Sequence, residues 1–288
     1  METYLANSAK IQTEDIDWAK AREIGLSDDE RFVLTYFSDI ELQTFVYMRM
    51  LINMKISLNP DVMGFLTAWN YEEFFHGRIL ARLLAECGHP LEENRVARVN
   101  AKSRFFERFE ATFTPLVSRL FSNQFPAVYL SFGAIQELTT LRGYERLRLS
   151  TKNPALRILC DRIARQERRH FAWYYNKAQE ELDKSRGARV LTRFIMNHHW
   201  TPVGAGVRSP EEVFRLFTIL FPQEAGVQLL NEVDEKISLL PGLSGMHLMG
   251  NYFMKAQKLF PLSSPANEIP FYQKLPMDSQ NTLEDILP

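Results

Sequence analysis

The chain has 288 residues, 24% of them charged and 45% hydrophobic, and its 34 basic and 35 acidic residues give a formal net charge of -1. This composition is typical of a folded globular protein and excludes a collagen-like or low-complexity chain. The near-zero charge gives no general attraction to nucleic acid or to an anionic membrane. The amino terminus lacks the pattern of a signal peptide and no long apolar run follows, so we expect a cytoplasmic protein.

Helix start and stop signals divide the first two thirds of the chain into long segments. Ser27 begins a capping-box pattern with Glu30, and Asn59-Pro60 and Asn153-Pro154 each supply a cap residue followed by a proline suited to the first turn. The predicted long helices cover residues 27–58, 59–88, 91–120, 127–149 and 153–182. We expect the segment 91–120 to cross between helix pairs.

The last third of the chain changes in pattern after Gly187. Ser209 and Glu212 form a second capping-box pattern, which begins a series of shorter helices. Strand alternation with hairpin turn signals is not found. The sequence therefore predicts an all-α protein with one domain over 1–260, a core bundle at about 27–185, C-terminal helices at about 188–260 and an extended tail over 261–288.

Each of four predicted helices carries an ionisable side chain within its apolar stripe. Glu41, for example, continues the spacing of three and four residues set by Leu34, Phe37 and Phe45. The other three stripes contain one glutamate each, and two of them also contain a histidine. The inward-facing residues are Glu41, Glu73, His76, Glu137, Glu167 and His170.

Buried carboxylates on this scale require a counter-charge, because an isolated one costs several kcal/mol or takes up a proton. Lysine and arginine do not occupy the stripes at the matching level, so a metal is the favoured source. Glu73 and His76, like Glu167 and His170, form a Glu-x-x-His pair whose spacing places both side chains on one helix face. A bundle with satisfied buried ion pairs is the alternative interpretation.

Two such pairs, with a lone glutamate from each of two further helices, make the ligand set of ferritin-like di-iron or di-manganese bundles. The sequence therefore predicts a ferritin-like four-helix bundle with extra crossover and C-terminal helices. Carboxylate and imidazole ligands suit iron that reacts with dioxygen, whereas a structural zinc site would use more cysteine or histidine. Manganese is the alternative metal.

Cys87 and Cys160 are interpreted as core residues in a reducing compartment.

Three segments also carry a family resemblance. Residues 67–77 contain a Trp followed by Glu-Glu-x-x-His-Gly, residues 162–170 end in Glu-x-x-His, and residues 137–140 contain Glu-x-x-Thr. In these motifs the chain resembles the soluble acyl-[acyl-carrier-protein] desaturases, over about residues 27–257. One departure is Gln166, which stands where that family usually has Asp.

The resemblance implies a role for each residue. Glu41 and Glu137 would be terminal iron ligands, and Glu73 and Glu167 would bridge two irons. His76 and His170 would supply one imidazole per iron. Thr140 would lie on the oxygen-binding side as a catalytic proton donor, although a hydroxyl that only packs between helices is an equal interpretation.

The resemblance further implies an oxygen-dependent desaturase acting on an acyl chain bound to an acyl carrier protein. It would take electrons from a ferredoxin-like donor and form a homodimer. Gln166 lacks the negative charge of the Asp that the family usually has at this position. The alternative is therefore a ferritin-like di-iron oxygenase, acting as a hydroxylase or N-oxygenase in a specialised biosynthetic pathway. A ferroxidase or iron-storage bundle and a scaffold with a degenerate site are weaker alternatives, because the chain is long and all six ligands are present.

Further residues have two interpretations each. Five aromatic residues are interpreted as core side chains, with electron transfer as the alternative: Tyr36, Trp69, Tyr144, Trp173 and Tyr174. A dock for an acidic carrier protein is one hypothesis for a basic group, and solvated helix faces are the other: Lys102, Arg104, Arg108, Arg186, Arg189 and Arg193. The run His198-His199-Trp200 is interpreted as surface or loop packing.

Overall fold

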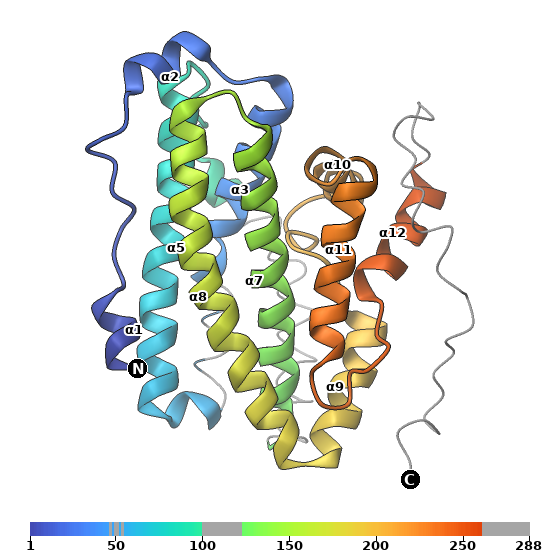
Figure 1. Cartoon of the computed structure of the whole chain (residues 1–288). Coiled ribbons are helices and arrows are strands. Elements are labelled where there is room, and N and C mark those ends of the chain that lie inside the picture. The colour runs from blue at the N-terminus through green and yellow to red at the C-terminus, as the bar shows by residue number, and fades with distance from the viewer. Residues whose placement is uncertain (46–47, 49–51, 53–54, 100–122, 261–288) are drawn as a thin grey trace. The chain divides into compact units, whose positions relative to one another are not determined.

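The computed structural model describes residues 1–45, 48, 52, 55–99 and 123–260, and all regular elements within them are helical (Figure 1). The prediction of an all-α protein is therefore confirmed for this part of the chain. Among these residues no helix has the length and apolar character needed to cross a bilayer. The elements are α1 (Glu2–Ala6), α2 (Trp18–Ile24), α3 (Asp28–Glu41), η1 (Lys55–Leu58), α5 (Pro60–Glu86), α7 (Phe125–Ser150), α8 (Pro154–Lys184), α9 (Arg186–His199), α10 (Pro210–Leu220), α11 (Gln223–Ser238) and α12 (Leu248–Leu259).

The predicted helix starts are confirmed by their caps. The hydroxyl of Ser27 accepts the amide of Glu30, and the Glu30 carboxylate accepts the amide of Ser27, so α3 begins with a complete capping box. Ser209 and Glu212 form the same reciprocal pair at the start of α10. At α5 the side chain of Asn59 accepts the amide of Asp61, and Pro60 occupies the first turn.

The helix predicted over 27–58 is interrupted, which is a correction. The structure ends α3 at Glu41, and the next backbone bonds are turn-like, with the amide of Gln43 donating to the Ile40 carbonyl at 2.8 Å. The hydroxyl of Thr44 donates to the Glu41 carbonyl at 2.9 Å and so competes with the helical pattern. Beyond the break the apolar spacing does not mark a buried face, because Phe45 is 36% exposed and Ile52 is 43% exposed.

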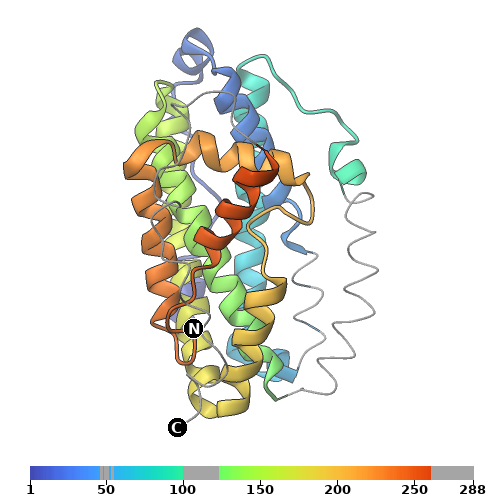
Figure 2. The same cartoon turned by 90° about the vertical axis from the view of Figure 1, so that its right-hand side faces the viewer.

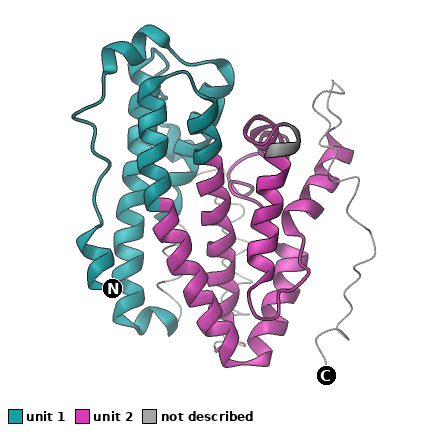
Figure 3. Ribbon diagram, in the orientation of Figure 1, with its two compact units in different colours: residues 1–122, 144–166 teal, residues 123–143, 167–288 magenta. Residues whose placement is uncertain are grey.

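The chain divides into two compact units, residues 1–122 with 144–166 and residues 123–143 with 167–288 (Figure 3). The division falls inside α7 and α8, each of which is one continuous helix. The single domain over 1–260 stays a prediction. The tail 261–288 and residues 100–120 of the predicted crossing helix lie outside the described residues.

In unit 1, α3 and α5 lie side by side and run in opposite directions (Figures 1 and 2). They approach closely at Gly77, where a Cβ atom would lie 2.6 Å from Cγ of Leu42 and 3.2 Å from the Ser38 carbonyl oxygen. The hydroxyl of Ser38 donates to the Gly77 carbonyl at 3.0 Å. Glu41 and His76 are next to this contact in sequence. The contact therefore fixes how far α3 is shifted along α5 at the position of these two side chains.

The turn that joins α7 to α8 is held by Asn153, which is almost fully buried. Its side-chain oxygen accepts the amides of Ala155 and Leu156 at 3.1 and 3.2 Å and caps α8. Its side-chain nitrogen donates to the carbonyls of Ala21 and Gly25 at 3.0 and 2.9 Å, at the end of α2. The side-chain amide of Asn153 therefore caps the start of α8 and bonds the carbonyls at the end of α2, which positions the first half of α8.

In unit 2, helix α12 packs on α10 and α11 (Figure 2). The buried carboxylate of Asp234 on α11 accepts the amides of Met249 and Gly250 at 3.0 and 3.1 Å, in the first turn of α12. Burial raises the pKa of Asp234 to about 7, while these amides act in the opposite direction. The carboxylate is thus a structural element of unit 2.

Replacing Asn153 by alanine should destabilise the protein more than replacing the exposed cap residue Asn59. Asn59→Ala removes one capping bond, which costs about 1 kcal/mol. Asn153→Ala also removes the bonds that the side chain donates to the Ala21 and Gly25 carbonyls, so we expect a loss of about 2–4 kcal/mol. Urea unfolding of the two variants measures the difference, and equal losses would contradict the bridging role of Asn153.

Candidate metal centre

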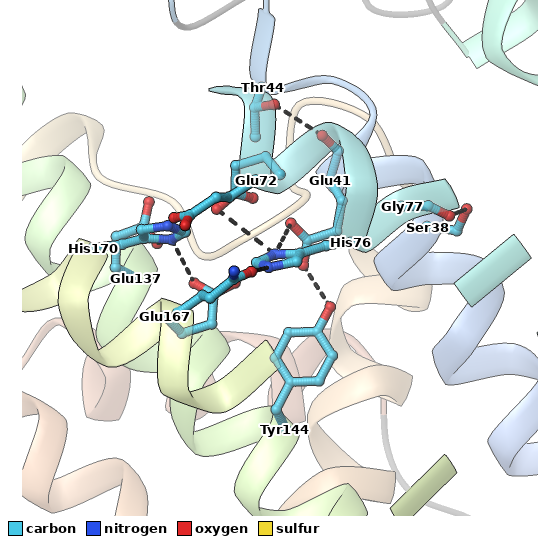
Figure 4. A network of polar contacts seen from close by, with 12 residues as sticks. Ser38, Glu41, Thr44, Glu72, His76, Gly77, Glu137, Tyr144, Glu167 and His170 are labelled. Carbon is cyan, nitrogen blue, oxygen red and sulfur yellow. Dashed lines mark hydrogen bonds and ion pairs between the residues drawn. The ribbon is translucent and has the colours of Figure 1, made fainter. Parts of the chain in front are cut away.

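In unit 1 the structure brings together the three predicted ligands that α3 and α5 provide (Figure 4). Nδ1 of His76 lies 3.8 Å from a carboxylate oxygen of Glu41 and 3.9 Å from one of Glu73. All three side chains are buried, His76 completely. Glu73 and His76 share a face because they are three residues apart on α5, and Glu41 is the last residue of α3.

Unit 2 repeats this arrangement on α7 and α8. Nδ1 of His170 lies 3.5 Å from a carboxylate oxygen of Glu137 and 3.4 Å from one of Glu167. These three side chains are buried too. The predicted pattern of one imidazole with one neighbouring and one more distant carboxylate therefore occurs twice.

The separations within each trio suit ligands of a common ion better than hydrogen-bonded partners. A nitrogen-to-oxygen hydrogen bond normally spans about 2.7–3.2 Å, whereas these atoms are 3.4 to 3.9 Å apart. Nitrogen and oxygen ligands bind a divalent first-row metal at about 2.0–2.2 Å, so two ligands of one ion are separated by at most about 4.4 Å. The donor set and its spacing thus fit a metal ion.

The possible ligand atoms of each trio also lie close together. Within unit 1 those of Glu41, Glu73 and His76 are all within 4.8 Å of one another, and within unit 2 the same is true of Glu137, Glu167 and His170. Each unit therefore offers two carboxylates and one imidazole to a cation.

The electrostatics of the groups favour a bound cation. Burial raises the pKa of the Glu137 carboxyl to about 8, against the opposing effect of the His170 imidazole beside it. The neighbouring Glu167 carboxylate acts in the same direction as burial. A carboxylate in this position is therefore costly unless a positive charge shares the site.

Two residues next to the ligands were not assigned to the site from the sequence. The hydroxyl of Tyr144 donates to Glu41 at 2.5 Å, and Figure 4 shows the tyrosine pointing at that carboxylate. The amide oxygen of Gln166 lies 2.6 Å from Nε2 of His76. The signal for Tyr144 was available, because it lies seven residues after Glu137 and so on the same helix face.

Glu72 is a third residue beside the candidate ligands, one position before Glu73. Its carboxylate is completely buried and accepts the hydroxyl of Tyr4 at 3.3 Å. The resemblance drew attention to the Glu-Glu pair, but only the second glutamate was predicted as a ligand, and Glu72 is not part of the trio of Glu41, Glu73 and His76.

Thr140 lies on α7 three residues after Glu137 and is half-buried. Its neighbour Thr139 is buried and donates its hydroxyl to the Ile135 carbonyl at 2.7 Å, which is a helix-packing role. A catalytic role for Thr140 stays a prediction.

Most of the other singled-out aromatic residues are core side chains, as interpreted. Tyr36, Trp69, Tyr144 and Tyr174 are buried, and Trp173 is half-buried. Tyr144 differs in that it also bonds a predicted ligand. The interpretation of the His198 region is confirmed: His198 is exposed, its ring nitrogen lies 2.8 Å from the Phe194 carbonyl, and Trp200 is buried.

Both interpretations of the basic group, the dock and the solvated helix face, are wrong for Arg193. That side chain is buried and donates to the carbonyls of Gly242 and Ser244 at 3.3 and 2.7 Å, so it is not available to a partner. Arg189 donates to the Leu182 carbonyl at 3.1 Å. Lys102, Arg104 and Arg108 lie outside the described residues. The spacing of apolar residues in a sequence does not reveal that an arginine side chain donates hydrogen bonds to the backbone carbonyls of a distant loop.

Both cysteines are free thiols. Cys160 is buried, as predicted for a core residue, whereas Cys87 is only half-buried, so the core interpretation is wrong for Cys87. Burial raises the pKa of both thiols, Cys160 more than Cys87.

Comparison of the sequence and structure with protein-family models, curated proteins and solved structures gives no significant match. The family resemblance therefore rests on the motifs alone.

Replacing Tyr144 by phenylalanine should weaken metal binding without removing a ligand. The hydroxyl holds one oxygen of Glu41, and loss of such an outer contact typically costs about 10- to 100-fold in metal affinity. Competition with a chelator measures the affinity, and Tyr71→Phe, at an exposed position of the same protein, is the control. Unchanged affinity in Tyr144→Phe would show that the contact does not support Glu41.

Proposed function

We propose that this protein is a ferritin-like di-iron oxidoreductase that uses dioxygen to desaturate an acyl chain bound to a carrier protein. The single observation that supports the metal centre best is that each unit buries two glutamates and one histidine whose possible ligand atoms lie within 4.8 Å of one another. The choice of reaction rests on the resemblance of three motifs to acyl-[acyl-carrier-protein] desaturases. A ferredoxin-like donor and a homodimeric state are part of the same proposal.

In this proposal six residues would hold the metal, with the roles that the resemblance implies: Glu41 and Glu137 would be terminal ligands, Glu73 and Glu167 would be shared, and His76 and His170 would each supply one imidazole. The donor set of four carboxylates and two imidazoles matches that of di-iron bundles. Bound iron would supply the electrons that activate dioxygen, which no side chain in the cluster can do. Manganese would occupy the same ligands.

The protein itself would orient the ligands and shield them from water. The apolar neighbours Leu80, Leu141 and Ile163 on α5, α7 and α8 are buried, as are the ligands themselves. Tyr144 holds Glu41 in one orientation by donating to it. Rigid, buried ligands of this kind favour a defined metal geometry and exclude water that would intercept a reactive centre.

Metal analysis after anaerobic loading with iron(II) should give about two ions per chain. Glu167→Ala should lose both, because the proposal makes that carboxylate a ligand shared by both ions, while His76→Ala should lose at least the ion that its imidazole would hold. Asp234→Asn, at a buried carboxylate outside the cluster, is the matched control and should retain both. Two ions in Glu167→Ala would disprove the site assignment.

The reaction is tested by mass spectrometry of the products. The reduced, iron-loaded protein is incubated with dioxygen and acyl chains on an acyl carrier protein, and desaturation should lower the acyl mass by two hydrogens. A gain of one oxygen would instead support the oxygenase alternative, a hydroxylase or N-oxygenase. An unchanged mass with every acyl chain tested would contradict the proposed desaturase.

A further inference from the structure

Gln166 makes two contacts that together connect the metal centre to the amino-terminal segment. Its side-chain oxygen lies 2.6 Å from Nε2 of His76, and its side-chain nitrogen donates to the carbonyl of Ala9 at 2.7 Å. Gln166 and His76 are both buried. The three residues are far apart in sequence, so these contacts are a product of the fold.

The chemistry of these groups fixes the direction of every hydrogen bond. A backbone carbonyl can only accept, so the amide nitrogen of Gln166 must face Ala9 and the amide oxygen must face His76. An oxygen can only accept from the imidazole, so Nε2 of His76 must carry a hydrogen. Nδ1 is then the nitrogen whose lone pair can bind a metal, and it is the one that faces Glu41 and Glu73.

The segment that contains Ala9 is held in place at several further points. Arg162, one turn before Gln166 on α8, donates to the Gln12 carbonyl and to both carboxylate oxygens of Asp15, at 2.5 to 2.8 Å. Ile11 and Ile16 are buried. We call residues 9–16 the N-terminal strap. Its anchors keep the Ala9 carbonyl in position to orient the Gln166 amide.

We propose that Gln166 is a positioning residue that sets the tautomer and orientation of His76, and that the N-terminal strap in turn sets the orientation of Gln166. The inference rests on the proposed function, because it concerns a ligand of the proposed metal centre. Metal-binding histidines generally donate their second ring N–H to an oxygen acceptor, which fixes the tautomer. Here the acceptor is a neutral amide whose own orientation is decided by a backbone carbonyl.

The amide of Gln166 satisfies both neighbours, because it offers one acceptor to His76 and one donor to the Ala9 carbonyl. An ionised carboxylate at position 166 would accept from His76 but would place a second acceptor against the Ala9 carbonyl, which is repulsive. Gln166→Glu therefore separates the two contacts, keeping the one to His76 and breaking the one to the strap. Gln166→Ala removes both.

The two variants are compared in two measurements on the full-length protein. Hydrogen exchange of the strap amides should become about tenfold faster in both, because each loses a bond worth about 1–1.5 kcal/mol. Release of bound cobalt(II) to a chelator should become about 10- to 100-fold faster in Gln166→Ala. In Gln166→Glu the release rate should stay within about threefold of the wild-type rate, because the acceptor for His76 is retained.

Arg162→Ala is the matched control, since it loosens the strap from the same face of α8 and leaves Gln166 in place. It should speed exchange of the strap amides with a smaller effect on cobalt release than Gln166→Ala. Wild-type release in Gln166→Ala would overturn the positioning role. Unchanged strap exchange in Gln166→Glu would overturn the link to Ala9.

Nitrogen NMR of histidine-labelled, metal-free protein tests the tautomer without reference to metal binding. We expect Nε2 of His76, assigned by its loss in His76→Ala, to be protonated. A bare Nε2 would overturn the inference even if the protein binds two metals. Failure of the wild-type protein to bind any metal would instead disprove the proposed function and leave the NMR and exchange results intact.

Discussion

The burial of two carboxylates beside one imidazole, in each of the two units, is the constraint on which the rest of this structure depends. Apolar side chains on the same helix faces exclude the water that would otherwise solvate these charges. The raised pKa of Glu137 reflects the cost of that exclusion. In the proposed function, a divalent cation bound by each trio would remove this cost.

The local structure around the candidate ligands of unit 1 holds them in place. The close approach at Gly77 sets α3 against α5, and the two buried contacts of Tyr144 and Gln166 orient one carboxylate and one imidazole. Asn153 fixes the beginning of the helix that carries Gln166, Glu167 and His170. These residues contribute orientation rather than charge, which is why composition and net charge gave no sign of them.

The helices and the inward orientation of the six candidate ligands could be predicted because both depend on short-range sequence patterns. Caps such as Ser27 with Glu30 mark helix starts, and a glutamate that continues an apolar stripe must point inward. The end of α3 could not be predicted in this way, because the apolar spacing continues past Glu41 while Thr44 and Gln43 redirect the backbone. The contact between Gln166 and Ala9 was equally hidden, since it joins residues 157 positions apart.

Anomalous diffraction from crystals of the iron-loaded protein, recorded on both sides of the iron absorption edge, tests the central claim most directly. The account predicts two iron peaks about 3.5–4 Å apart, with Glu73 and Glu167 contacting both and Nδ1 of one histidine contacting each. A single peak, or peaks away from these six side chains, would contradict it.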